Sequence, residues 1–372
     1  MQSFPEIRER GFVYVDKTRY IQKLMDDRKY YFLGRPRRFG KSLFISTMKT
    51  FFEGRRELFN GLAIAEIEKE WAAWPVLHID FTGRDYTSNE KSLTETLTRM
   101  IELWEKEYNC TNIANDLGAR FESVILSAHQ KTGKQVIILV DEYDKPLIDT
   151  IEYPELQEKF RNQLRGIYGN LKKMDSHIRL AFLTGITRFG KLNIFSDINN
   201  LRDISLLPEF SGICGVTSDE LRQYFHAGVT EFADWQKCSV EEMYEILRVN
   251  YDGYHFSPVG SPDIYNPFSL LNALSGKMIG EYWFSTGTPL FLVKRIRAEV
   301  LNLADFNGLE LEATDIENVP FNMEGDPVPI LYQSGYLTIK GYDCETKLIT
   351  LGYPNREVET GFLRQLMDVY TD

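Results

Sequence analysis

Five consecutive apolar residues at positions 136–140, four of them β-branched, are followed directly by two carboxylates, Asp141 and Glu142. A strand that is apolar at every position has no face suited to water, so it has to be covered on both sides, as in a parallel sheet between helices. Other β-branched or aromatic runs alternate with longer amphipathic stretches in the first half of the chain. These runs lie at residues 30–33, 76–81, 178–183 and 203–206. The pattern predicts an α/β fold with a parallel sheet flanked by helices.

A loop suited to phosphate binding follows the first of these runs. Gly40 allows a tight turn, Lys41 can reach the β- and γ-phosphate oxygens, and Ser42 offers a hydroxyl to Mg²⁺. A helix expected from about residue 43 would point its first amides at the anion. The sequence therefore predicts a P-loop, also called a Walker A motif. The residues that we assign to nucleotide binding are Gly34, Arg35, Pro36, Arg37, Arg38, Phe39, Gly40, Lys41, Ser42 and Leu43.

The spacing of this loop departs from the usual P-loop pattern. Five residues separate Gly34 from Gly40 instead of four, and Arg35 stands at the position expected for the first glycine. A Gly-Lys-Ser tripeptide also occurs by chance. The three arginines of the loop could grip phosphates or a neighbouring subunit, or form an exposed, solvated cluster.

The carboxylates after the 136–140 run have the character of a Walker B motif. Phosphoryl transfer needs a carboxylate near Mg²⁺, which we assign to Asp141, and a group that orients or deprotonates water, which we assign to Glu142. A strand that merely ends in solvated acids is the alternative. The upstream loop favours the catalytic interpretation, because the Walker A and Walker B motifs of a nucleotide-hydrolysing site then occur in the expected chain order.

A hydroxyl and a cation follow the next predicted strand. Thr184 and Arg188 could sense the γ-phosphate or neutralise charge in the transition state. Alternatively, Thr184 only closes the strand and Arg188 pairs with a surface acid.

The second half of the chain has a different pattern. Capping boxes at 217–220 and 239–242, and prolines at positions suited to a first helical turn at 267 and 289, predict helices. Alternating runs at 334–339 and 348–351 predict a β-hairpin. We expect a P-loop domain at 1–215, a helical lid at 216–298, and a winged-helix-like domain at 299–372.

Charge and composition limit the partners of the chain. Its 43 basic and 54 acidic side chains give a net charge of −11, so any nucleic-acid contact has to be local. No apolar run approaches the roughly 20 residues that cross a bilayer, and no basic and then apolar leader opens the sequence. The four cysteines include no Cys-x-x-Cys pair. We expect free thiols, no membrane segment and a cytoplasmic protein.

The sequence resembles a bacterial family called AAA-ATPase-like, whose members often carry a PD-(D/E)XK nuclease-like domain at the C-terminus. The blocks that carry the resemblance are residues 4–8, 14–18, 35–42, 140–146, 184–188, 251–254, 265–269 and 332–337. The loop spacing described above is the one this family shows. The resemblance implies that the 178–183 strand lies between the loop strand and the Asp141 strand, and that segment 16–18 lies near the nucleotide base. It also implies a nuclease-like module, but we assign no nuclease site before the sequence stops at Asp372 and expect either a short natural chain or a truncation.

These observations together predict Mg²⁺-dependent ATP binding and hydrolysis that drives a switch. The switch would act on a nuclease-like or nucleic-acid-linked module. A homo-oligomer and nucleic-acid binding through the winged region are further partner hypotheses. The alternatives are a nucleotide-binding scaffold that does not hydrolyse ATP and recruits a partner or DNA through the winged domain, and a small-molecule kinase.

Overall fold

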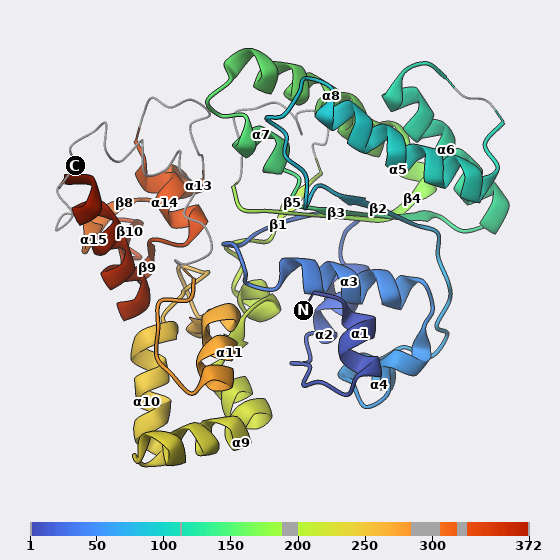
Figure 1. Cartoon of the computed structure of the whole chain (residues 1–372). Coiled ribbons are helices and arrows are strands. Elements are labelled where there is room, and N and C mark those ends of the chain that lie inside the picture. The colour runs from blue at the N-terminus through green and yellow to red at the C-terminus, as the bar shows by residue number, and fades with distance from the viewer. Residues whose placement is uncertain (1, 112–113, 188–199, 284–305, 318–325, 371–372) are drawn as a thin grey trace.

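The computed structural model describes residues 2–111, 114–187, 200–283, 306–317 and 326–370. Its N-terminal half is built on a five-stranded sheet in which every pairing is parallel (Figure 1). The strands are β1 (Tyr30–Gly34), β2 (Val76–Asp80), β3 (Val136–Asp141), β4 (Ile178–Gly185) and β5 (Arg202–Asp203). Their order is β2-β3-β4-β1-β5. The strand β4 thus separates the loop strand from the Asp141 strand, as the family resemblance implies.

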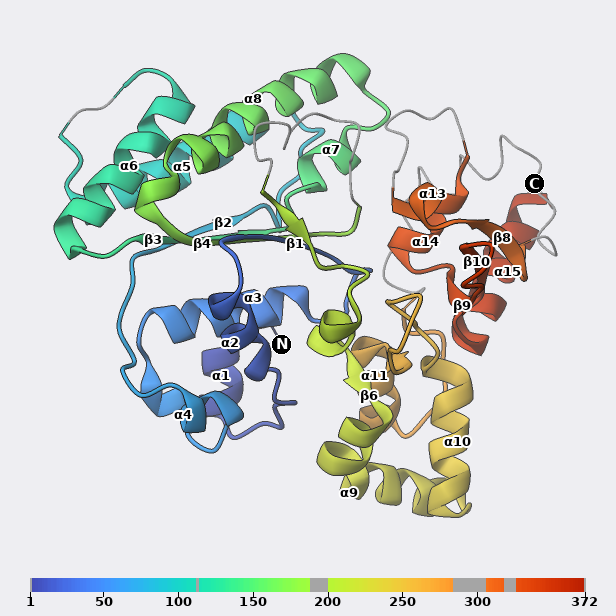
Figure 2. The same ribbon diagram turned by 180° about the vertical axis from the view of Figure 1, so that it is seen from behind.

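Helices cover both faces of this sheet (Figures 1 and 2). One face carries α1 (Phe4–Glu9), α2 (Arg19–Asp26), α3 (Lys41–Phe52) and α4 (Ala63–Ile67). The opposite face carries α5 (Ser92–Tyr108), α6 (Leu117–Thr132), α7 (Lys145–Asp149) and α8 (Pro154–Lys173). All six residues of β3 are buried between these layers, which explains the apolar run of the sequence. The predicted parallel α/β fold is confirmed.

The strand expected at 203–206 is shorter and lies earlier than predicted. It pairs with β1 only through Arg202 and Asp203. The Asp203 carboxylate then accepts a hydrogen bond from the amide of Ser205 (2.8 Å), which turns the chain away from the sheet. The Ser205 hydroxyl, in turn, accepts a hydrogen bond from the backbone amide of Gly34 in β1 (2.7 Å). The side-chain bond of Asp203 therefore ends the strand before the apolar pattern does.

Three helices with a hydrophobic core of their own follow the sheet. They are α9 (Ser218–Gln236), α10 (Val240–Tyr251) and α11 (Pro267–Gly276). Both predicted capping boxes are present, and Asn266 caps α11. A short antiparallel pair, β6 (Val216–Thr217) and β7 (Ile264–Tyr265), lies beside them. The predicted helix start at 288–289 lies outside the described residues.

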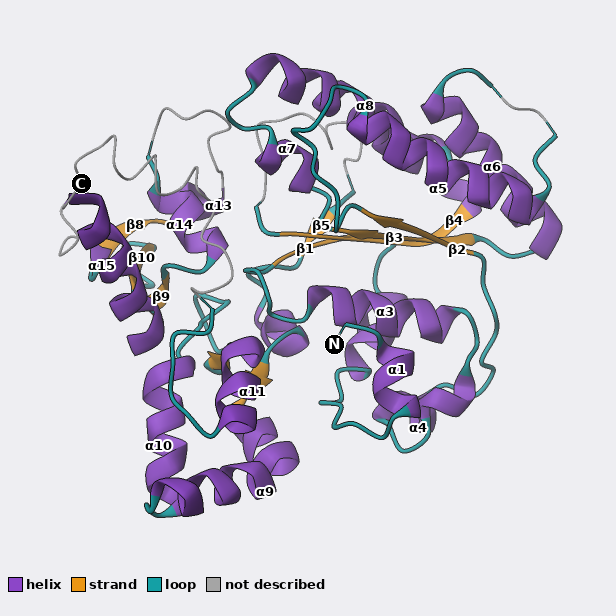
Figure 3. Ribbon diagram, in the orientation of Figure 1, coloured by secondary structure: helices purple, strands orange, loops and turns teal. Residues whose placement is uncertain are grey.

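The described part of the C-terminal region combines a small antiparallel sheet with α-helices (Figure 3). The sheet order is β8-β10-β9. The predicted hairpin is present, but residue 334 belongs to a helix, because Gly335 ends α14 with a φ of 93°. The elements are β8 (Leu309–Glu312), α13 (Ala313–Glu317), α14 (Val328–Ser334), β9 (Thr338–Tyr342), β10 (Leu348–Gly352) and α15 (Arg356–Tyr370). Short 3-10 helices lie at Arg56–Phe59, Asp175–His177 and Pro208–Ile213. The winged-helix assignment and the domain boundaries stay predictions.

Candidate functional site

The predicted phosphate loop connects β1 to α3 at the carboxyl edge of the sheet. Gly40 is the N-cap residue of α3, and its φ of 97° is one that glycine adopts without steric cost. The helix begins at Lys41, two residues earlier than expected, and runs for 12 residues. The first amides of such a helix have no carbonyl partner within the helix, so they favour an anion.

A cleft of about 800 Å³ opens over this loop. Lys41 and Ser42 reach it from the start of α3, and Glu142 and Asp144 reach it from the end of β3. The remaining lining residues are Gln2, Arg37, Arg38, Gly40, Leu43, Lys145, Ile148, Ile186, Pro267, Phe268 and Leu271. Side chains about a hundred positions apart in the sequence therefore meet at one cleft, because β1 and β3 end at the same edge of the sheet.

Lys41 is nearly inaccessible, with 5% of its surface exposed. Its ammonium group donates to the backbone carbonyls of Arg35 (2.7 Å) and Pro36 (2.9 Å). Burial lowers the pKa of Lys41, whereas the nearby carboxylates of Glu142 and Asp141 act to raise it. The ammonium group thus lies between the loop backbone and the acids of β3.

Asp141 is absent from the cleft lining and is almost completely buried at the end of β3. The hydroxyl of Thr184 donates to its Oδ1 atom over 2.8 Å. The two residues meet because β3 and β4 are neighbours with their ends in register. Thr184 thus orients the Asp141 carboxylate, a contact that the sequence did not predict.

Glu142 has an unusual backbone at the point where β3 ends. Its φ of 51° lies in the left-handed region of backbone conformation, which residues other than glycine rarely adopt. Burial raises the pKa of Glu142, and the Lys41 ammonium group opposes that shift. Such strain often occurs at functional sites. Here it turns the carboxyl group of Glu142 into the cleft while Asp141 stays in the sheet.

Asp144 is a candidate site residue that the sequence analysis missed. Its Oδ2 atom accepts hydrogen bonds from the amides of Ile186 (2.9 Å) and Thr187 (2.7 Å), and from the Thr187 hydroxyl (2.8 Å). Its Oδ1 atom is buried and has no hydrogen-bond partner among the described residues. The one signal in the sequence was its position three residues after Asp141, close to the end of the strand that carries the predicted site. Arg188, the predicted cation of this segment, lies outside the described residues.

Several residues of the predicted loop do not line the cleft. Gly34, Arg35, Pro36 and Phe39 are absent from its lining. The guanidinium group of Arg35 donates hydrogen bonds to the backbone carbonyls of Gly34 and Ser205 (both 2.8 Å). Only 1% of the Arg35 surface is exposed. Arg35 therefore fixes the back of the loop, while Arg37 and Arg38 line the cleft.

Segment 16–18, expected near a nucleotide base, also lies outside the cleft lining. Asp16 accepts hydrogen bonds from Thr18 and from the amide of Ala63. Lys17 forms an ion pair with Glu220 of α9 over 2.6 Å. The segment connects the N-terminal helices to α9, and its contact with a base stays a prediction.

The oxygen ligands near the cleft fit Mg²⁺. Ser42 lines the cleft with a hydroxyl, and the Asp141 carboxylate is buried next to Glu142 in the sequence. Mg²⁺ in phosphate-binding sites takes few protein ligands beside water and phosphate oxygens. Across the described ranges, no three His, Cys, Asp or Glu side chains gather as a metal site of their own. No helix in those ranges has the length and apolarity needed to cross a membrane.

The five-stranded parallel sheet flanked by helices, with a strand-loop-helix turn at its carboxyl edge, fits a P-loop type α/β protein. A family model described as "Predicted AAA-ATPase" matches residues 1–195. An uncharacterized protein from the vnfD 5' region of Azotobacter chroococcum mcd 1 is 34% identical over 380 residues. That alignment covers 99% of this chain and 69% of the relative. The chain belongs to the AAA-ATPase-like family.

Proposed function

We propose that this protein binds ATP with Mg²⁺ in the cleft and hydrolyses it. One observation carries the proposal: Lys41, Ser42 and Glu142 line a single cleft at the carboxyl edge of a sheet in which β4 separates their strands. In this proposal a phosphate chain would lie in the cleft near the ammonium group of Lys41 and the carboxylate of Glu142.

The loop would hold the phosphates. Lys41 supplies a positive charge, and the first amides of α3 supply donors that point into the cleft. Ser42 and Asp141 would hold Mg²⁺, with Thr184 keeping the Asp141 carboxylate in place. Bound Mg²⁺ would offset negative charge on the phosphate oxygens.

Glu142 would orient and deprotonate the attacking water. Its carboxylate faces the cleft from the strained end of β3 and can accept a proton when ionised. Arg188 follows Thr187, which Asp144 holds by two hydrogen bonds. We propose that Arg188 senses or neutralises the γ-phosphate, in the same or a neighbouring molecule.

Paired measurements of nucleotide affinity and turnover test these roles. We expect Lys41→Ala to lose MgATP binding, and Glu142→Gln to keep binding while losing turnover. Lys49→Ala and Glu53→Gln are matched controls, because these residues form an exposed pair at the far end of α3. Failure of the parent to bind MgATP would refute the function, and parent-like hydrolysis by both site variants would refute the residue assignment.

The coupled partner is the less defined part of the proposal. We propose that hydrolysis drives a switch linked to a nuclease-like or nucleic-acid-binding module, acting in the cytoplasm, where the four unpaired cysteines would stay reduced. Duplex DNA binding that weakens steeply with salt would support a nucleic-acid link, and no binding at low salt would exclude it. Turnover by the parent separates this function from a scaffold that only binds nucleotide.

A further inference from the structure

The phosphate loop is bulky where such loops usually carry small residues, and its side chains contact the second half of the chain. The Arg35 guanidinium lies over the ring of Phe256, 4.2 Å from the ring centroid. The Arg38 guanidinium lies over the ring of Phe268 at 4.0 Å. Phe39 packs edge-to-face against the Phe256 ring, with centroids 5.3 Å apart. The loop is thus held by residues more than 200 positions later.

Gly335 makes the closest of these approaches. A Cβ atom at this position would lie 2.8 Å from the Cβ and 2.9 Å from the Cγ atom of Pro36, closer than real side chains come. The φ of Gly335 is 93°, and its amide closes the last turn of α14. The turn after α14 therefore rests directly on the proline ring of the loop, with no space for a side chain.

Trp283 holds the next loop residue through a hydrogen bond. Its indole N–H donates to the backbone carbonyl of Arg37 over 3.3 Å. The Trp283 ring packs against Tyr336, next to Gly335, with centroids 5.0 Å apart. Its own amide donates to Glu357 of α15 (2.8 Å). Trp283 thus links the loop backbone to the turn after α14 and to α15.

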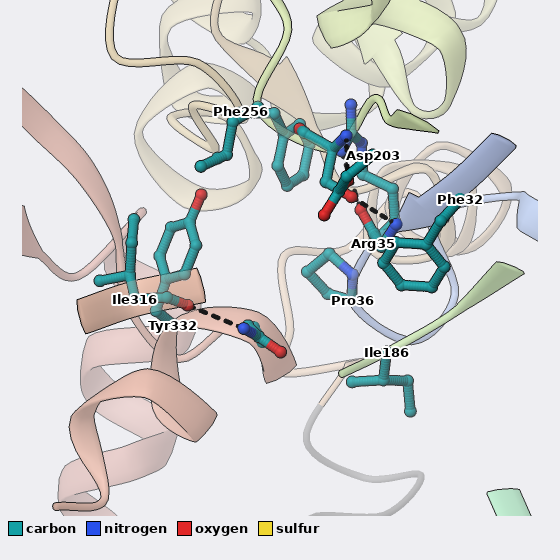
Figure 4. Close-up of a pocket in the computed structure, with 12 residues that line it drawn as sticks. Phe32, Arg35, Pro36, Ile186, Asp203, Phe256, Ile316 and Tyr332 are labelled. Atoms are coloured by element: carbon teal, nitrogen blue, oxygen red, sulfur yellow. Dashed lines mark hydrogen bonds between the residues drawn. The ribbon is translucent and has the colours of Figure 1, made fainter. Parts of the chain in front are cut away.

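The outer side of the loop borders a small cavity of about 50 Å³. Figure 4 shows Arg35 and Pro36 on one side of it, facing Ile316 and Tyr332 of the C-terminal region. The carbonyls of the same two loop residues accept hydrogen bonds from the Lys41 ammonium group. The C-terminal region and Lys41 therefore both contact one short backbone segment.

We propose that the C-terminal region sets the conformation of the phosphate loop, with Gly335 and Trp283 as positioning residues. A phosphate bound to Lys41 competes with the carbonyls of Arg35 and Pro36, so binding would shift the backbone on which both residues rest. Coupling of this kind is reciprocal, so the same contacts report nucleotide binding to the C-terminal region. This inference rests on the nucleotide-binding function proposed above.

Two glycine substitutions test the contact. Gly335→Ala adds a methyl group against Pro36, whereas Gly308→Ala adds one to a glycine with nearly the same φ (94°) and no atom within 4 Å of the added carbon. Both changes impose similar backbone strain, and Gly335→Ala adds the clash with Pro36, so we expect both melting temperatures to fall, with the larger loss in Gly335→Ala. We expect only Gly335→Ala to weaken MgATP binding, by roughly tenfold, within the usual range of coupling between sites. A merely structural role would lower both melting temperatures and leave the two affinities equal.

Trp283→Phe provides a second test that does not depend on the folding of the glycine variant. It removes the indole donor to Arg37 and keeps an aromatic ring against Tyr336. Trp235→Phe is its control, since Trp235 is 69% exposed. We expect MgATP affinity to fall several-fold in Trp283→Phe alone. If the parent binds MgATP and neither test variant differs from its control, the inference is wrong while the proposed function stands. A parent that binds no MgATP refutes both.

Discussion

At the scale of single residues, Glu142 combines two opposing influences. Burial disfavours its ionised form, and the ammonium group of Lys41 favours it. The net result is a pKa above the ordinary value of 4.5. A general base must be ionised to accept a proton, so a raised pKa moves the acid limb of the pH profile upward.

We therefore expect kcat for ATP hydrolysis to rise with pH through a midpoint above 4.5 and then level off. Below that midpoint Glu142 is protonated and cannot activate water. Steady-state rates between pH 4.5 and 8, with melting curves at each pH, measure this. A profile that is already flat at pH 5 would contradict the assignment of Glu142 as the base.

Thr184 gives a second prediction at this scale. Replacing it with Val removes the hydroxyl that donates to Asp141 and leaves a buried carboxylate oxygen without that partner. Because hydrogen bonds to charged groups contribute more than neutral ones, we expect a loss of about 2 kcal/mol in unfolding free energy and a fall in turnover. Chemical denaturation and ATPase assays measure the two effects.

Thr184→Ser is the matched control, since it keeps the hydroxyl and removes only a methyl group. We expect turnover close to the parent for this variant. Equal turnover in the Val and Ser variants would show that the hydroxyl does not orient Asp141 for the reaction.

At the scale of secondary-structure elements, α15 is joined to α11 through a buried carboxyl group. Glu357 accepts hydrogen bonds from the Ser269 hydroxyl (3.0 Å) and from the Trp283 amide (2.8 Å). Burial is the main reason that the pKa of Glu357 rises to about 7. The folded protein thus retains a proton here that the unfolded chain releases at lower pH.

Stability should therefore decrease as pH rises from about 4.5 to about 7 and level off above that, because the fold favours the neutral form of Glu357. Between pH 5 and 8 we expect this group to account for about 2–3 kcal/mol of lost unfolding free energy. Denaturant titrations of the parent and of Glu357→Gln at both pH values measure it. Asp252, whose pKa is raised to about 6, titrates in both proteins, so their difference isolates Glu357. Parallel pH curves for the two proteins would contradict the prediction.

At the scale of the whole molecule, one buried ion pair connects the N-terminal segment to the helices after the sheet. Lys17 is 8% exposed and bonds both carboxylate oxygens of Glu220, which also completes the capping box of α9. Removal of one member of a buried pair leaves the other charge without compensation. We expect Lys17→Met to cost about 2 kcal/mol in unfolding free energy, since Glu220 keeps some contact with water.

Lys23→Met is the control for this substitution, because the Lys23 ammonium group makes an exposed hydrogen bond to the Glu209 carbonyl and lies over the Tyr20 ring, without a carboxylate partner among the described residues. A double-mutant cycle with Glu220→Gln would assign the loss to the pair itself. A cost no larger than that of the control would show that the pair does not join the two parts of the molecule.

Much of the architecture follows from local chemistry. The apolar run at 136–140 required a strand covered on both faces, and the capping boxes at 217–220 and 239–242 required helix starts. Local bonds also explain where prediction was wrong. The carboxylate of Asp203 ended β5 early, and the left-handed backbone of Gly335 ended a helix where a strand was expected.

The sequence alone determined the loop, the acids and the order of their elements, because side-chain periodicity and capping act over a few residues. Only the tertiary structure decided that Glu142 turns into the cleft while Asp141 bonds Thr184, and that Trp283 and Gly335 rest on the loop. Contacts across more than 200 positions leave no periodic pattern in a sequence. They depend on how strands order and how domains pack, which is a property of the folded chain as a whole.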